Sequence, residues 1–121
     1  MFDVLEELNK TSGVSGSMLV GHDGIVIAAD LQATFEDDTL GALAASITAN
    51  IKKSMDRLNQ PKPEQITIEA EHNKLFLTDC EVGVLVVVTE KDANLGLIRL
   101  EVRNARKKIN TPLGLTGGDQ G

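Results

Sequence analysis

The sequence predicts an α/β/α sandwich: a five-stranded antiparallel sheet with a long helix on one face and the two terminal helices on the other. Three observations support this fold class. The middle of the chain repeats apolar residues at helical spacing over about 20 residues. Two strand-like segments precede it and three follow it, separated by short turns. One of them, VLVVV at 84–88, is apolar throughout and predicts a central strand covered on both faces.

The N-terminal part of the chain predicts a helix followed by a β-hairpin. Residues 2–10 place their apolar side chains on one helical face. Strands are expected at GSMLV (16–20) and IVIAA (25–29). The Asp23-Gly24 pair between them predicts a type I′ turn, because that turn needs positive φ at both central residues and these residue types tolerate it.

The middle segment predicts the long helix, with Asp37 or Asp38 as its N-cap and with Pro61 and Pro63 ending it. Seven apolar residues form the stripe expected to face the sheet: Leu40, Leu43, Ala44, Ile47, Ile51, Met55 and Leu58. The opposite face carries small residues and then charged ones: Ala42, Ala45, Ala49, Lys52, Lys53, Asp56 and Arg57.

The remaining elements complete the sheet and its second helical layer. QITIEAE (65–71) alternates apolar and polar residues and, coming after a long crossover, is expected at a sheet edge. KLFLTDC (74–80) predicts its neighbour, and residues 94–109 predict the last helix. We therefore expect one domain over 1–110 and a flexible tail at 111–121.

Composition excludes several functional classes. With 121 residues, a net charge of −6, three Phe and no Tyr or Trp, the chain lacks the basic and aromatic surface that nucleic acid binding requires. No apolar run approaches the roughly 20 residues of a membrane span. The acidic start MFDVLEELNK does not resemble a signal peptide, and the single cysteine forms no internal disulfide. A cytoplasmic protein without a membrane or nucleic acid partner is expected.

Residues that could carry catalysis are few. The two histidines, His22 and His72, fall at expected turns, and no spacing typical of a metal site occurs. GHDG at 21–24 fits the GxxG pattern of KH loops, but it joins strands, and Asp23 would repel phosphates. Cys80 is interpreted as a small semi-buried side chain. We therefore expect neither an enzyme nor a bound metal or cofactor.

The small residues of the long helix suggest a contact with a second chain. Ala42, Ala45 and Ala49 would allow another helix to approach closely, although alanine is also simply the best helix former. The edge strand offers unpaired backbone groups near Ile66, Thr67 and Ile68. Pairing with its own copy about a two-fold axis would join the strand edge and the alanines in one homodimer interface.

The order and lengths of these elements resemble the roadblock/LC7 family, which shares a profilin-like architecture. The resemblance rests on LVGHDGIVIAA, FEDDTLGALAASITA, the strands that end in VLVVV, and NLGLIRLEVRNARKKI. It implies dimerisation through the long helix and the strand after it, giving a ten-stranded sheet. It also implies binding to small Ras-like GTPases, which the prokaryotic MglB-like branch stimulates without inserting an arginine finger.

The family has no invariant catalytic residue, so the resemblance implies a surface rather than an active site. On this chain that surface would include Lys52, Lys53, Asp56 and Arg57. The expected function is a homodimeric module that regulates or scaffolds a small Ras-like GTPase. A structural light-chain-like adaptor remains the alternative, and a small-molecule sensor is disfavoured because aromatic residues are scarce.

Overall fold

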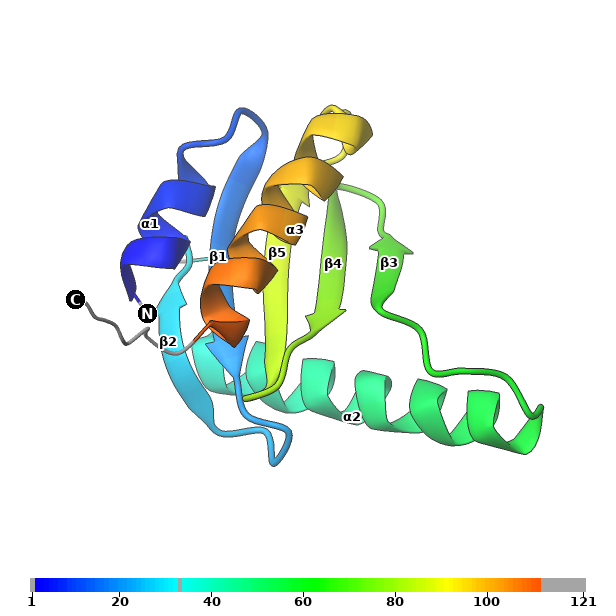
Figure 1. Cartoon of the computed structure of the whole chain (residues 1–121). Coiled ribbons are helices and arrows are strands. Elements are labelled where there is room, and N and C mark those ends of the chain that lie inside the picture. The colour runs from blue at the N-terminus through cyan, green and yellow to red at the C-terminus, as the bar shows by residue number, and fades with distance from the viewer. Residues whose placement is uncertain (1, 33, 112–121) are drawn as a thin grey trace.

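The computed structural model describes residues 2–32 and 34–111 (Figure 1). Its elements are α1 (Phe2–Asn9), β1 (Val14–Val20), β2 (Val26–Asp30), α2 (Asp37–Arg57), β3 (Gln65–Glu69), β4 (Asn73–Asp79), β5 (Val84–Glu90) and α3 (Leu95–Asn110). The five strands are antiparallel in the order β2-β1-β5-β4-β3, so the predicted fold class is confirmed. The predicted tail, apart from Thr111, lies outside the described residues.

Figure 1 shows α2 on one face of the sheet and α1 with α3 on the other. The central strand β5 explains this arrangement, because its successive side chains point to opposite faces. Val84, Val86 and Val88 belong to the apolar cluster on the α2 side. Leu85 and Val87 belong to the cluster on the α1 and α3 side. All five are fully buried, so the prediction of a central strand covered on both faces is confirmed.

The β1–β2 hairpin is present, but the prediction of its turn type was wrong. The Gly24 amide donates to the Gly21 carbonyl (2.9 Å), which makes His22 and Asp23 the central residues. Gly24 has φ +87°, whereas neither central residue has positive φ, as a type I′ turn would require. The Asp23 carboxylate instead accepts the Ile25 amide (3.0 Å), a local bond that stabilises the turn.

Both ends of α2 also differ from the prediction. The N-cap position is Glu36 rather than Asp37 or Asp38; the two aspartates lie in the first turn, where they favour the positive end of the helix dipole. The helix ends before the prolines because Asn59 adopts φ 56°. The Gln60 amide then donates to the Met55 carbonyl (2.9 Å), as in a Schellman motif.

The face that α2 presents to the sheet is rotated from the predicted stripe. Its buried residues are Leu40, Gly41, Ala44, Ala45 and Thr48. Leu43 and Leu58, predicted to face the sheet, are 53% and 66% exposed. The reason is a close approach: a methyl group at Gly41 would come within 3.1 Å of a Val20 methyl. Gly41, Ala44 and Ala45 therefore face the sheet of their own chain.

Phe76 should contribute much of the stability, because its ring is fully buried under α3. We expect Phe76→Ala to lower the free energy of unfolding by about 3–5 kcal/mol, measured by urea denaturation. Phe2→Ala is the matched control, since the Phe2 side chain is about half exposed and should cost far less. Equal losses for the two variants would contradict this account of the core.

Candidate interaction surface

β3 leaves one backbone edge unpaired. It pairs with β4 from Gln65↔Thr78 to Glu69↔Lys74 and has no strand on its other side among the described residues. Ile66 and Ile68 are half-buried and pack on the α2 side of the sheet, whereas Thr67 is exposed. The predicted edge position is confirmed. Such an edge can pair with a strand of another chain.

An apolar groove of about 150 Å³ lies next to this edge, between α2 and the outer strands. Its lining comes from α2, β3 and β4: Leu40, Leu43, Ala44, Ile47, Ile68, Leu75 and Leu77. The exposed side chain of Leu43 and the half-buried one of Ile47 form its helical wall. Apolar side chains left uncovered beside an unpaired strand edge are typical of an interface with another chain.

Two of the three predicted alanines, Ala42 and Ala45, lie near the β1–β2 turn rather than beside β3. A methyl group at Gly24, in the β1–β2 turn, would lie 3.6 Å from Ala42 Cα and 3.9 Å from Ala45 Cβ. That turn belongs to β2, the opposite edge of the sheet. Ala45 is buried against its own sheet, so its prediction as an exposed residue was wrong; Ala42 and Ala49 are exposed. Ala42 and Ala45 are therefore close to the edge of the sheet opposite Ile66–Ile68.

The predicted partner-binding charges also separate into two groups. Lys53, Asp56 and Arg57 are exposed on α2. The Lys52 side chain is only 29% exposed, and its Nζ lies 3.2 Å from Asp79 Oδ1. Lys52 thus binds within its own chain, which leaves the other three as the freely accessible charges of this group.

Asp79, at the end of β4, is the centre of a cluster that sequence reasoning missed. Its carboxylate lies 3.0 Å from His22 Nε2, 3.2 Å from Lys52 Nζ and 3.3 Å from Lys62 Nζ. Its carbonyl accepts a bond from Arg106 Nε (2.7 Å). His22, which we expected to be only a solvated turn neighbour, therefore has a partner 57 residues away.

These contacts set the ionisation of Asp79. Burial by itself would raise the pKa of the carboxyl group, but hydrogen bonds from His22, Lys52 and Lys62 outweigh it. The pKa of Asp79 is therefore lowered from its ordinary value of 3.8. The carboxylate stays charged at neutral pH and holds the turn, α2 and the segment before β3 together.

The described residues offer no cluster of three His, Cys, Asp or Glu side chains that could hold a metal ion. Cys80 is buried, and burial raises the pKa of its thiol to about 11, which disfavours a reactive thiolate. None of the helices within 2–32 and 34–111 combines the length and apolar character needed to cross a membrane. Among the described residues, the accessible features near β3 and α2 are the unpaired edge of β3, the apolar groove beside it and the exposed charges of α2.

Asp79→Asn should destabilise the fold at neutral pH by about 1–3 kcal/mol, because it removes charged hydrogen bonds from a mostly buried site. The pKa of this carboxyl group is lower in the folded chain than in the unfolded chain. Its charge therefore stabilises the fold at pH values above the unfolded-state pKa, and this contribution is lost as the pH falls through the folded-state pKa. The difference between wild type and variant should therefore shrink below about pH 4, measured by urea denaturation across pH. Glu64→Gln, at the largely exposed pair with Arg106, is the control and should cost at most about 1 kcal/mol. A pH-independent difference would contradict the assignment.

Comparison with known proteins gives the family. The protein-family model described as Roadblock/LC7 domain matches residues 2–90 of this chain. The uncharacterized protein MJ1340 of Methanocaldococcus jannaschii is 42% identical over 106 residues, which cover 88% of this chain and 93% of that protein.

Solved structures of other proteins share the fold, two MglB structures among them. Myxococcus xanthus MglB has a TM-score of 0.85 and 22% identity, covering 90% of this chain and 84% of its own. An MglB with a tetrameric arrangement has a TM-score of 0.79 and 25% identity, covering 89% and 83%. Since the family model spans more than half of the sequence, the chain belongs to the Roadblock/LC7 domain family.

Proposed function

We propose that this chain is a homodimeric binding module that regulates or scaffolds a small Ras-like GTPase. The observation that carries the proposal is the unpaired edge of β3 beside the uncovered apolar wall of α2. Membership of the Roadblock/LC7 family and the similarity to MglB support the same function. The proposal has two parts, self-association and recognition of the GTPase.

Self-association would join the β3 strands of two copies antiparallel about a two-fold axis. In Figure 1 the last turns of α2 run past the outer edge of β3, so they would overlie the partner's half of the sheet. Ile51 and Met55, half-buried, and the exposed Leu58 lie on this part of α2. Dimerisation would bury these side chains, whose apolar surface contributes about 25 cal/mol for each Å² removed from water.

The structure changes which helix residues we assign to this interface. Ile66, Thr67 and Ile68 keep their proposed role at the strand edge. Leu43 and Ile47 line the groove with Ile68 and are better placed than Ala42, which lies near the opposite edge, or Ala49, which does not line the groove. We therefore assign the helical part of the dimer contact to Leu43 and Ile47.

Recognition of the GTPase would use the exposed side of α2. Lys53, Asp56 and Arg57 are accessible there, and in a dimer two such surfaces would lie next to each other. Phosphoryl transfer depends mainly on positioning and on charge stabilisation by groups already present in the GTPase. A partner without a catalytic residue of its own can therefore change the rate by fixing the positions of those groups.

A second candidate is an adaptor in a larger assembly, without an effect on GTP hydrolysis. Near the opposite edge of the sheet, the side chains of Ile25, Ile27 and Val82 are 68%, 49% and 48% exposed and line one shallow hollow. This patch would remain uncovered after dimerisation through β3. The tetrameric arrangement of a similar MglB agrees with contacts beyond a dimer.

Leu43→Asp should convert the dimer into a monomer at micromolar concentration, measured by sedimentation velocity. Leu43 is half exposed within one chain, so the change should leave the fold intact while placing a charge in the interface. We expect at least a tenfold loss of dimer affinity, which corresponds to about 1.4 kcal/mol.

Ala49→Glu is the control for this experiment, because Ala49 is exposed on the same helix and is not one of the residues that line the groove. It should stay dimeric. If Ala49→Glu dissociates the dimer and Leu43→Asp does not, the contact lies on the alanine side instead. A wild-type chain that sediments as a monomer would overturn the homodimer itself.

The double variant Lys53→Glu, Arg57→Glu should weaken binding to a Ras-like GTPase from the same organism by about tenfold, because it reverses charges at the proposed contact. GTP turnover by that GTPase, measured with and without the wild-type chain, distinguishes regulation from adaptor function. Lys107→Glu, Lys108→Glu changes the same charge on α3 and should have no effect. Unchanged turnover with intact binding would favour the adaptor.

A further inference from the structure

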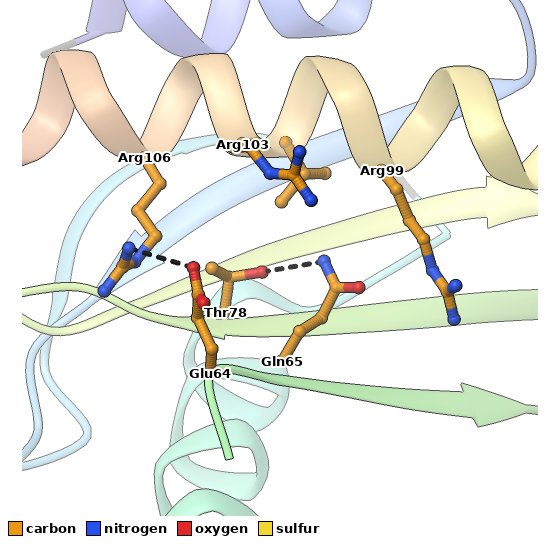
Figure 2. Close-up of a pocket in the computed structure, with 7 residues that line it drawn as sticks. Glu64, Gln65, Thr78, Arg99, Arg103 and Arg106 are labelled. Carbon is orange, nitrogen blue, oxygen red and sulfur yellow. Dashed lines mark hydrogen bonds and ion pairs between the residues drawn. The ribbon is translucent and has the colours of Figure 1, made fainter.

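A polar groove of about 110 Å³ lies on the face of the sheet opposite α2 (Figure 2). It runs between α3 and the outer strands and is lined by Glu64, Gln65, Thr78, Arg99, Val102, Arg103 and Arg106. Of these residues only Gln65 lies on β3, the strand proposed to pair in the dimer, and none belongs to the proposed GTPase contact. Three guanidinium groups and one carboxylate give the groove a net positive charge, whereas the whole chain carries −6.

One end of this groove is held in place. Arg106 Nε donates to the Asp79 carbonyl (2.7 Å), and its Nη1 lies 3.0 Å from Glu64 Oε1. On the floor, Gln65 Nε2 donates to Thr78 Oγ1 (3.3 Å). These contacts hold Arg106, Gln65 and Thr78 in place before a ligand binds, and groups that are already fixed lose less entropy on binding.

Arg99 and Arg103 supply the charge that these contacts leave uncompensated. They lie one helical turn apart on the same side of α3, and Figure 2 shows Arg103 between Arg99 and Arg106. Like charges at this spacing destabilise a helix by roughly 0.2–0.5 kcal/mol. Within the described part of the chain, no carboxylate lies within 4.0 Å of either guanidinium group. An anion placed between them would relieve this repulsion.

We propose that this groove binds the phosphate or diphosphate group of a small anionic ligand. A guanidinium group can donate two parallel hydrogen bonds to two oxygens of one phosphate group. The Thr78 hydroxyl and the Gln65 amide can add neutral hydrogen bonds. The volume equals that of about four water molecules, far below the roughly 300 Å³ from which drug-sized pockets begin. Among the described residues that line it Val102 alone is apolar, so the groove suits a compact charged group rather than an aromatic ring.

Inorganic pyrophosphate is the first probe. Its binding to the full chain is measured from ¹⁵N amide spectra at constant ionic strength. We expect saturable shifts centred on Gln65 and Thr78. Arg103→Glu should weaken binding at least tenfold. Lys108→Glu, the same charge change at an exposed position on the same helix, should retain it. Circular dichroism of each variant checks that the fold is intact.

Three comparisons decide the outcome. ADP binding with the same shifts and the same sensitivity to Arg103→Glu supports a phosphate site that small molecules fill. Non-saturating shifts, or equal shifts with chloride at matched ionic strength, overturn the site. Binding of a phosphoserine peptide without any binding of pyrophosphate or ADP overturns the assignment to a small molecule. Sedimentation velocity on Arg103→Glu shows whether the dimer is unaffected, so a failure of this site is distinguishable from a failure of the proposed dimer.

Discussion

The burial of β5 on both faces is the constraint on which the rest of the structure depends. Its five apolar residues, Val84–Val88, cannot be covered by one layer of helices, because alternate side chains point to opposite sides of the sheet. One layer comes from α1 and α3, and the other from α2 alone. A single helix can cover its face only if it lies close to the strands, and the glycine and alanines of α2 permit this approach.

The same close approach determines which surface is left for a partner. Because Gly41, Ala44 and Ala45 occupy the face toward the sheet, the larger Leu43 and Ile47 are displaced toward the β3 edge. Covering the core and exposing an apolar flank are thus two consequences of one helix orientation. A chain with bulky residues facing the sheet would hold α2 further away and would offer a partner a smaller apolar surface.

Much of the fold could be predicted from the sequence, because element order, the apolar run of β5 and the edge position of β3 follow from local patterns. The orientation of α2 could not, since periodicity identifies an apolar stripe but does not show how closely a helix packs. Nor could the partners of Asp79, because His22 and Lys52 are far from it in sequence. The spacing of Arg99, Arg103 and Arg106 was a visible signal for a basic helix side, but the groove beneath it depends on where β3 and β4 lie.

Asp79 connects these features, because each of its polar groups holds a different part of the molecule. Its amide donates to the Glu64 carbonyl (3.1 Å), which fixes the chain just before β3 begins. Its carboxylate contacts Lys52 of α2, and its carbonyl accepts from Arg106 of α3, so one residue joins the two helical layers. An unpaired edge strand tends to fray, and a strand that frays pairs poorly with a partner. By holding the start of β3 between both layers, Asp79 keeps this edge in the extended form that strand pairing requires.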